Sequence, residues 1–453
     1  MKVIFFIDKI NNYRTFSKFI EEGLKRGINI ECCHDYRYSK TGDRSYLFPH
    51  IEKSPFYNSN YDRLTFKKIM HDSDYNSLIR ENNDIDYYVS YYPLFFKLED
   101  NLLEKISGKW CIISNILDAY LIVWHWHYFG FIKSQLLLEY YRMFFPTTNS
   151  LYADGMNWMK KYPDPEGKDN YKFFDSKYTK VYPIGNSLYN KSLSDFEKEN
   201  VRMKYGVPPG NNILIYLPFP FYPSRSNFCW QAAFSGIFVN KYKIEKRENV
   251  KVSLRTIIVS IVEKILYSVK IMCDREARMW LIRGWNEPSV IKSIRSFCDK
   301  NHLLLVVKPR RKFHFSEKVY KCADIVIDDD ESQQYPSILQ ELLSISKLVM
   351  GYHTTAVIES VTANVLHVNI ECPVSFFEDE ARVELHSCRE GSIYNFSGAV
   401  VNMTIQELLA NFSEKKLVGL SSESVDRNAY KHKYIGPEHP TAAENFYDIL
   451  ESK

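Results

Sequence analysis

The stretch from Leu339 to Pro373, LQELLSISKLVMGYHTTAVIESVTANVLHVNIECP, decides the fold of this chain. Its pattern predicts an amphipathic helix, a short apolar strand, a Gly-Tyr-His-Thr-Thr turn, a second helix and a second strand. A β-turn-α unit of this kind leaves unpaired backbone N–H groups at the start of its helix, where an anion is favoured. We therefore expect a phosphate beside this turn.

Three side chains of the turn and the following helix fit a nucleotide. The hydroxyls of Thr354 and Thr355 are expected to face the phosphate. Glu359 lies about one helical turn further on, where a carboxylate can reach a ribose hydroxyl. His353 either contacts the same ligand or only shapes the turn. In the structural alternative, Thr354 is a plain N-cap and Glu359 a solvated acid of the first turn.

The composition is that of a soluble globular protein. A chain of 453 residues exceeds one usual core, so two domains of roughly 200 residues are expected. A net charge of +4 is too small to indicate a nucleic-acid partner. Nine cysteines without a CxxC pair indicate a reduced, cytosolic protein, and neither the N-terminus nor residues 116–132 read as an export signal or a membrane span.

The first half of the chain opens with a β-α-β pattern. Val3–Ile7 is apolar at every position, which predicts a parallel strand covered on both faces. Helical spacing follows from Phe16 to Leu24, Gly27 suits a C-cap, and Ile28–Cys32 is the next predicted strand. Further strands are expected at 85–91, 110–114, 147–152 and 180–184, and helices at 61–80 and 133–145.

Four residues of this half are candidate catalytic bases. Asp8 follows the first strand directly, at the carboxyl end where ligands of parallel sheets usually bind. Asp118 follows the strand at 110–114, and His125 and His127 stand in the run WHWHYFGF. General bases are commonly His or Asp held near an acceptor hydroxyl. The two histidines lack a nearby third ligand, so no metal site is expected.

A second β-α-β pattern begins at Ile213–Leu217, after a charged, Pro- and Gly-containing segment that predicts a linker over 191–211. Leu303–Val307 is its next strand and ends in KPRRK. Cations at the carboxyl end of a parallel strand are placed to hold phosphates, so Lys308 and Arg310 are candidate ligands. Residues 222–286 interrupt the pattern with a basic run and an amphipathic helix, which either contacts an anionic bilayer surface or packs on its domain.

Short motifs resemble those of a known family. KYTKVYPIGN at 177–186 is similar to the strand and Gly-Asn turn that closes the first domain of GT-B glycosyltransferases. KPR at 308–310 and GYHTTAVIES at 351–360 resemble the Lys-Pro-His and Ser-Ser or Thr-Ser elements of bacterial surface-polysaccharide transferases that use CMP-Kdo or CDP-glycerol. Arg310 stands where that family often has His.

The resemblance implies an α/β fold with two Rossmann-like doubly wound domains facing across a cleft. Thr354, Thr355, Lys308 and Arg310 would then hold the donor's phosphates or carboxylate, and Glu359 its ribose. The implied organisation is an acceptor-binding domain over 1–190, a linker over 191–211, a donor-binding domain over 212–425 with the helical insertion 222–286, and a C-terminal helix within 426–453 that packs back on the first domain.

The activity that the resemblance implies is metal-independent transfer of a sugar from a nucleotide donor to a hydroxyl of a glycan or lipid-linked glycan. No cofactor is expected, and the reaction is either inverting or retaining. Two alternatives stay open: a CDP-glycerol-type glycerophosphotransferase, and a non-catalytic nucleotide-sugar-binding or assembly protein. The location expected is the cytoplasm, with a peripheral contact at the inner membrane surface if the basic insertion binds lipid.

Overall fold

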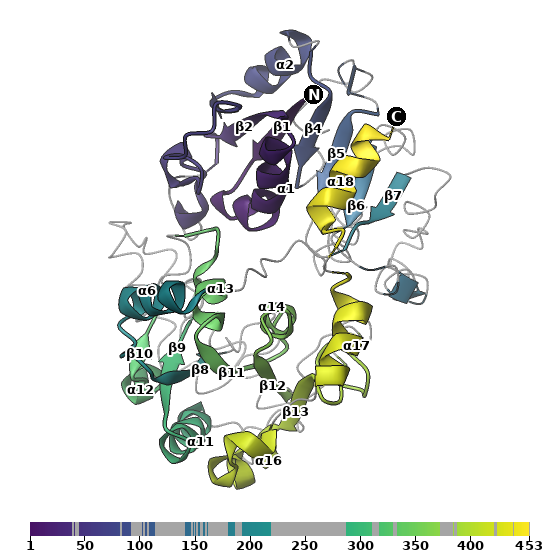
Figure 1. The fold of residues 1–453 in the computed structure, drawn as a ribbon. Helices are drawn as coiled ribbons and strands as arrows, with labels where there is room; N and C mark the ends of the chain where they lie inside the picture. Colours follow the sequence, from purple (N-terminus) through teal and green to yellow (C-terminus); the bar gives the residue numbers. More distant parts are fainter. Residues whose placement is uncertain are drawn as a thin grey trace, which may run out of the picture.

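The computed structural model forms two lobes, each built on one parallel sheet (Figure 1). The residues described are all those of the chain other than 39, 41–44, 82–83, 92–101, 103–104, 107, 114–140, 146–147, 149, 151–152, 155–156, 159–160, 162–179, 186–192, 219–286, 310–316, 329–332, 372–383, 385–386, 421–423, 438 and 453.

The first lobe holds a seven-stranded sheet in the order β3-β2-β1-β4-β5-β6-β7, in which neighbouring strands pair in parallel. Val3–Ile7 lies within β1 and is buried throughout, so the prediction of a strand covered on both faces is confirmed. The helix α1 (Tyr13–Lys25) follows it as expected. The strands are β1 (Lys2–Ile7), β2 (Asn29–Asp35), β3 (Leu64–Ile69), β4 (Tyr87–Ser90), β5 (Trp110–Ile113), β6 (Tyr141–Phe145) and β7 (Lys180–Pro183).

Two predicted helices of this lobe are wrong in part. The helix expected over 61–80 is the edge strand β3 followed by α2 (Asp72–Glu81). Leu64 and Phe66 alternate toward the core, which is a period of two and not of 3.6. The end of the helix expected over 133–145 is the strand β6, whose backbone pairs with β5 and β7. Tertiary pairing overrides local preference at both places.

The second lobe holds a six-stranded parallel sheet in the order β10-β9-β8-β11-β12-β13. The runs Ile213–Leu217 and Leu303–Val307 form β8 and β9, as predicted. The strands are β8 (Asn212–Leu217), β9 (Leu303–Val307), β10 (Ile325–Val326), β11 (Ser346–Gly351), β12 (Leu366–Glu371) and β13 (Val400–Thr404), and the helices are α6 (Asp195–Tyr205), α11 (Glu287–Lys300), α12 (Glu317–Cys322), α13 (Ile338–Leu343), α14 (Ala356–Thr362) and α16 (Ile405–Asn411).

Capping boxes fix the starts of several of these helices. At Thr404 and Glu407, the hydroxyl accepts the Glu407 N–H while the carboxylate accepts the Thr404 N–H. The segment expected to be a linker contains α6, which begins with the same device at Ser194 and Glu197. Gly206 ends α6 with a φ of 68°, a left-handed conformation that favours glycine.

The C-terminal segment contacts both lobes in turn (Figure 1). The helix α17 (Ser424–Tyr434) packs on α14 of the second lobe, through Tyr430 and Tyr434. The helix α18 (Ala442–Glu451) packs beside α1 on the first lobe. The Phe446 ring lies 5.3 Å from that of Phe19 and 4.7 Å from that of Phe144. The chain thus enters the first core twice, at its beginning and near its end.

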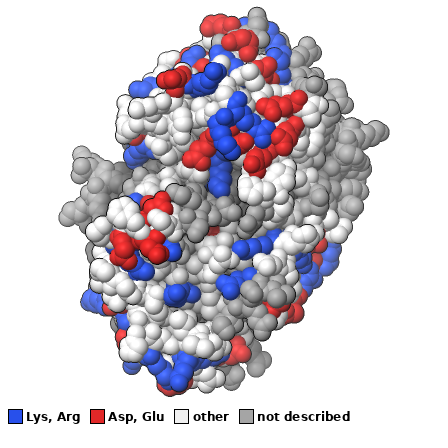
Figure 2. All heavy atoms as spheres, in the orientation of Figure 1, with Lys and Arg blue, Asp and Glu red and all other residues white. Residues whose placement is uncertain are grey.

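An ion-pair network covers the contact between α1 and α18. Arg26 reaches Glu22 at 2.7 Å, Asp448 at 2.7 Å and Glu451 at 3.0 Å. Figure 2 shows basic and acidic side chains intermixed on this face of the first lobe. Because these groups are partly exposed, we assign the packing of α18 mainly to the buried aromatic residues and not to the ion pairs.

Two hydrogen bonds join the lobes beside the start of α13. The Arg14 Nε of α1 donates to Gln334 Oε1 at 3.0 Å, and the Tyr335 hydroxyl donates to Glu21 Oε2 at 2.7 Å. Arg14 follows the carboxyl end of β1, and Gln334 precedes α13 on the carboxyl side of the second sheet. The carboxyl-side connections of both sheets therefore meet.

Candidate functional site

The predicted donor residues lie at the carboxyl edge of the second sheet. The chain starts this sheet at β8, adds β9 and β10 on one side, and then adds β11, β12 and β13 on the other. Such a switch in strand order opens a crevice at the carboxyl ends, where ligands of parallel sheets bind. Lys308 follows β9, and its N–H donates to Tyr216 O of β8 at 3.0 Å. The Gly351–Thr355 turn follows β11 on the other side of β8.

Close packing fixes the beginning of this turn. A Cβ atom on Gly351 would lie 2.9 Å from Thr354 Cγ2 and 3.3 Å from Leu217 Cβ, so only glycine fits without displacing a neighbour. His353 has a φ of 37°, in the left-handed region that costs a non-glycine residue about 1–2 kcal/mol. The turn is thus held in an unusual conformation by its surroundings, as is frequent at ligand sites.

The hydroxyls of Thr354 and Thr355 differ in whether they bond to the following helix. The Thr354 hydroxyl accepts the Ala356 N–H at 3.3 Å and so stabilises the start of α14. The structural alternative from the sequence names Thr354 as the N-cap, whereas the N-cap residue is Thr355 and the Thr354 hydroxyl binds the first N–H of the helix. The Thr355 hydroxyl makes no capping bond to the helix. Glu359 lies within α14 and is half-buried.

The His353 ring is directed toward the segment before β13. It is 9% exposed, and its centroid lies 5.0 Å from that of Tyr394. Its Nε2 and Nδ1 lie 3.8 and 4.0 Å from Cys388 Sγ. Burial raises the pKa of Cys388 to about 12, so this thiol is not a nucleophile near neutral pH.

A buried polar chain behind the turn was not foreseen from the sequence. The His353 N–H donates to Asn369 Oδ1 at 2.8 Å, Asn369 Nδ2 donates to Asn402 Oδ1 at 2.8 Å, and Asn402 Nδ2 donates to Glu371 Oε2 at 2.9 Å. Asn369 is fully buried in β12. The signal in the sequence is an asparagine that follows a histidine by two positions inside the mostly apolar run VLHVNI.

Polar groups also gather at the carboxyl edge of the first sheet. Asp8 follows β1 and is half-buried. Asp35 ends β2 and binds Arg37 through two hydrogen bonds of 2.9 and 2.8 Å, while the Tyr75 hydroxyl donates to Asp35 Oδ2 at 3.0 Å. The Arg37 guanidinium also lies over the Tyr75 ring, 4.7 Å from its centroid. The charge of Asp35 is thus paired within the lobe.

His34, next to this cluster, is a buried neutral imidazole. Its Nδ1 lies 3.0 Å from Pro49 O, which can only accept, so Nε2 accepts from the Tyr13 hydroxyl at 2.8 Å. Burial lowers the pKa of His34 to about 4. Because its side chain has no exposed surface, His34 stabilises the lobe and is not a base for an external hydroxyl.

Several predicted residues lie outside the described part of the chain. These are the candidate bases Asp118, His125 and His127, the candidate donor ligand Arg310, and the basic insertion 222–286. The described predicted residues divide between the two carboxyl edges: Asp8 on the first, and Lys308, His353, Thr354, Thr355 and Glu359 on the second.

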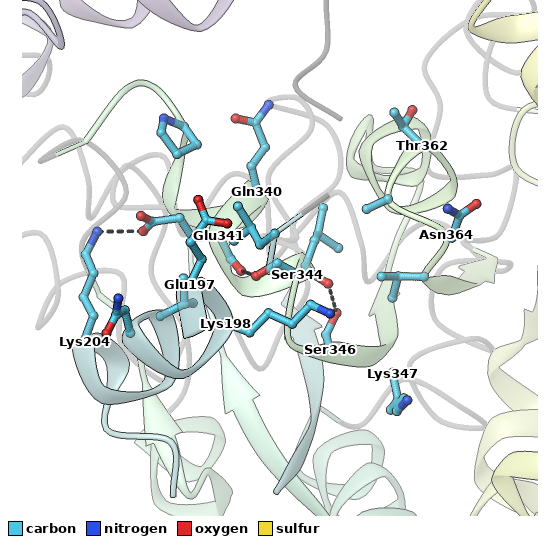
Figure 3. A pocket seen from close by; sticks show the side chains of 17 residues that line it. Glu197, Lys198, Lys204, Gln340, Glu341, Ser344, Ser346, Lys347, Thr362 and Asn364 are labelled. Carbon is cyan, nitrogen blue, oxygen red and sulfur yellow. Dashed lines mark hydrogen bonds and ion pairs between the residues drawn. The ribbon is translucent and has the colours of Figure 1, made fainter. Parts of the chain in front are cut away.

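A cavity of about 560 Å³ lies elsewhere on the second lobe (Figure 3). It is lined by α6, α13, the first residues of β11 and the last of α14, and Lys204 of α6 reaches Glu341 of α13 across it at 2.7 Å. Ser346 begins β11 and Val365 directly precedes β12, and both line the cavity. The cavity therefore lies at the amino-terminal ends of these strands, opposite the carboxyl edge. None of the predicted site residues lines it, so we treat it as separate from the switch-point edge.

Two absences among the described residues bear on membrane and metal binding. No helix among them is long and apolar enough to cross a membrane. No group of three His, Cys, Asp or Glu side chains in that part of the chain comes together as a metal site would require.

Comparison with known proteins identifies the fold. No family model and no curated protein matches the sequence. Among solved structures, UGT89C1 of Arabidopsis thaliana complexed with UDP aligns over 100% of this chain and 99% of its own, with 10% identity and a TM-score of 0.51. A histidine-to-alanine variant of the wall teichoic acid polymerase TagF aligns over 100% and 88%, with 10% identity and a TM-score of 0.52. The predicted GT-B fold, with two doubly wound α/β lobes, is confirmed.

Proposed function

We propose that this protein is a glycosyltransferase that moves a sugar from a nucleotide donor to a hydroxyl of a bacterial surface glycan. The observation that carries the proposal is the switch-point edge of a GT-B fold with Lys308 on one side of β8 and the Gly351–Thr355 turn on the other. A UDP complex among the structures of this fold is in keeping with a nucleotide donor. We favour a cytidine nucleotide such as CMP-Kdo, with a UDP-sugar as the other choice, from the motif resemblance.

The donor binds to the second lobe in this proposal. Lys308 and Arg310 pair with phosphate or carboxylate oxygens, the Thr355 hydroxyl and the backbone of the turn donate to phosphate, and Glu359 accepts from the ribose. Fixed cations and N–H groups then stabilise the charge that develops on the leaving nucleotide, so no divalent ion is required.

The acceptor binds to the first lobe, which supplies the base if the reaction inverts configuration. Asp8 is the described candidate, because it follows β1 at the edge that meets the second lobe. Asp118, His125 and His127 stay candidates from the sequence. A retaining reaction needs no base at these positions. Closure of the two lobes around both substrates would assemble the site.

A phosphotransferase of the CDP-glycerol type is the second candidate. The observation that favours it is the alignment with TagF, a wall teichoic acid polymerase, over the whole of this chain. The two activities differ in whether phosphate stays on the product. Mass measurement of the product separates them, because a glycerophosphate unit adds phosphorus to the acceptor and a sugar does not.

The first experiment is a thermal-shift series with CMP, CDP, UMP, UDP and GDP. A ligand that binds only the folded state raises the melting temperature with the logarithm of its saturation. We expect one nucleotide family to stabilise the protein. The absence of any stabilisation across the series would contradict nucleotide binding.

The second experiment compares two triple variants. Thr354→Ala, Thr355→Ala and Glu359→Ala together should remove both nucleotide stabilisation and turnover. The matched control is Lys198→Ala, Ser346→Ala and Lys347→Ala, which alters the separate cavity and should leave both intact. The opposite pattern would move the site to that cavity. Retained turnover in the first variant would contradict the proposed site, and a scaffold would keep its partners in both.

The basic insertion 222–286 supplies a peripheral membrane contact at the cytoplasmic face in this proposal. Its lysines and arginines would pair with anionic lipid headgroups. Activity measured with and without anionic vesicles tests this contact. Equal activity in both conditions would favour packing of the insertion on its own domain.

A further inference from the structure

The polar chain behind the Gly351–Thr355 turn has a direction that its two ends determine. At one end the His353 N–H can only donate, so Asn369 must present its carbonyl oxygen to it. The Asn369 amide nitrogen then faces Asn402, which must present oxygen in turn. At the other end the Glu371 carboxylate can only accept, so it takes the Asn402 amide nitrogen. Each bond in the chain therefore depends on the next.

The polar chain joins the turn after β11 to the next two strands, β12 and β13, and returns to β12 at Glu371. Gly351 of β11 pairs in register with Asn369 of β12, and Asn369 pairs with Asn402 of β13. Asn369 has no exposed surface, so its amide is held by these partners and not by solvent. Because both the oxygen and the nitrogen of this buried amide are hydrogen-bonded, Asn369 fixes the position of the turn relative to the sheet.

The segment before β13 gives the turn a second support. Tyr394 and Cys388 contact the His353 ring, and Asn395 Nδ2 donates to Cys388 O at 2.7 Å. The backbone of His353 is thus held from β12 and its ring from residues 388–395. Both contacts act on the residue whose φ lies in the left-handed region. Thr354 and Thr355 follow it directly, so its conformation decides where they point.

We propose that Asn369 is a positioning residue for donor binding, acting with Asn402 and Glu371 through the backbone of His353. Asn369 need not touch the donor. It holds the turn in the conformation that presents Thr355 and the following amides to the donor's phosphate. This inference rests on the proposed function, since it names what orients the same site.

The test uses the full chain and the nucleotide that stabilises the parent protein most. Asn369→Leu keeps the branched shape and the number of heavy atoms but removes the acceptor for the His353 N–H. We expect at least tenfold weaker nucleotide binding and a donor KM raised by a similar factor, with a smaller change in kcat. Leu408→Ala, in the core at α16, is the control for general destabilisation of the second lobe and should leave the affinity unchanged.

A rescue pair tests the direction of the chain. Asn369→Asp alone leaves two acceptors facing each other, either at Asn402 or at Glu371, and should weaken nucleotide binding. Asn369→Asp with Glu371→Gln restores a donor and an acceptor for every bond, because Asn402 can reverse its amide and accept from Gln. We expect the double variant to recover affinity over the Asp single variant. This pair also serves if Asn369→Leu does not fold.

The outcomes distinguish a failure of the positioning role from a failure of the proposed function. If the parent binds no nucleotide, the proposed function fails. If the parent binds and Asn369→Leu binds equally well, the positioning role is overturned. If the double variant is no better than Asn369→Asp, the directed chain is overturned. Loss in the Leu variant, recovery in the double variant and unchanged affinity in Leu408→Ala together support the inference, because general destabilisation of the second lobe would weaken binding in Leu408→Ala as well.

Discussion

In the first lobe Asp8 follows β1 and Asp35 ends β2, whereas in the second lobe Lys308 follows β9 and the Gly351–Thr355 turn follows β11. The order of strands is nearly the same in both lobes. In each, the first strand lies inside the sheet, and later strands are added first on one side of it and then on the other. The edge of the first lobe offers carboxylates, and that of the second offers a cation, hydroxyls and backbone amides. One architecture therefore presents groups suited to a proton on one side and to an anion on the other.

The two edges also differ in how their polar groups are held. In the first lobe, Asp35 is paired with Arg37 and Tyr75, and His34 is locked between Tyr13 and Pro49. In the second lobe, the buried chain from Asn369 ends on the backbone of the turn itself. The first arrangement stabilises its own lobe, and the second orients a backbone segment. We infer that the first edge stays rigid while the turn of the second is the part tuned for a ligand.

Phe446→Ala should give the largest effect and should confine it to the first lobe. This ring is buried between Phe19 and Phe144, so truncation should cost about 3–5 kcal/mol of unfolding free energy. Calorimetry is expected to show a lower melting temperature with nucleotide stabilisation of the second lobe retained. Phe196→Ala is the control, because Phe196 is 76% exposed on α6 and should change stability by less than about 0.5 kcal/mol. Equal effects of the two would contradict the assignment of α18 to the first core.

Gly351→Ala should act in the opposite lobe and on binding. The added Cβ would meet Thr354 Cγ2 at 2.9 Å, so the turn must shift, at a cost of about 1–3 kcal/mol. We expect nucleotide-dependent stabilisation to be lost. Gly419→Ala is the matched control, since a Cβ there meets nothing within 4 Å. Undiminished nucleotide binding in Gly351→Ala would show that the turn does not hold the donor.

The sequence predicts the two sheets well because several of their strands are continuous apolar runs that can be recognised from local sequence alone. Val3–Ile7, Ile213–Leu217 and Leu303–Val307 are apolar at each position, and such runs need burial on both faces wherever they lie. The edge strand β3 reads as part of a helix in the sequence, because an edge strand buries only alternate residues and carries polar residues between them. Its identity depends on pairing with β2, which no local pattern records.

The candidate site could be predicted only as far as its own turn. The Gly-Tyr-His-Thr-Thr segment stands out because it joins a strand to a helix. Asn369 does not, because its partner Asn402 lies 33 residues later and meets it only through the sheet register. For the same reason the pairing of His34 with Tyr13 on α1 was not foreseen, since the two meet only in the packed core.

Acid should lower the unfolding free energy of both lobes, through buried His34 in the first lobe and buried His367 in the second. Burial lowers the pKa of His34 to about 4 and that of His367, which contacts Ser360 beneath α14, to about 3. Each is neutral when folded and takes up a proton only when unfolded, so its contribution is complete above about pH 6.5 and is lost as the pH falls toward the folded pKa. At pH 5 each should have lost about 2 kcal/mol.

Urea unfolding at pH 7.5 and pH 5.0 measures this loss. His34→Gln should reduce the acid-induced loss of stability in the first lobe by about 2 kcal/mol, and His367→Gln should do so in the second. His432→Gln is the control, because His432 is exposed on α17. A pH dependence that is unchanged in both buried variants would assign acid sensitivity to other groups.

Tyr335→Phe should give the smallest change in stability, and it tests how the two edges are brought together. Its hydroxyl donates to Glu21 across the lobes beside the bond from Arg14 to Gln334, and the pair is partly solvated, so we expect no more than about 1 kcal/mol. The lobes also meet through the ion pair of Lys161 with Glu384 and the hydrogen bond from the Thr148 hydroxyl to the Lys433 carbonyl. We therefore expect only a small increase in the radius of gyration, measured by X-ray scattering without ligand, when one of the two bonds beside α13 is lost. Tyr57→Phe, exposed on the first lobe, is the control. An unchanged radius in Tyr335→Phe, and also when Arg14→Ala is added, would mean that these bonds do not hold the lobes together.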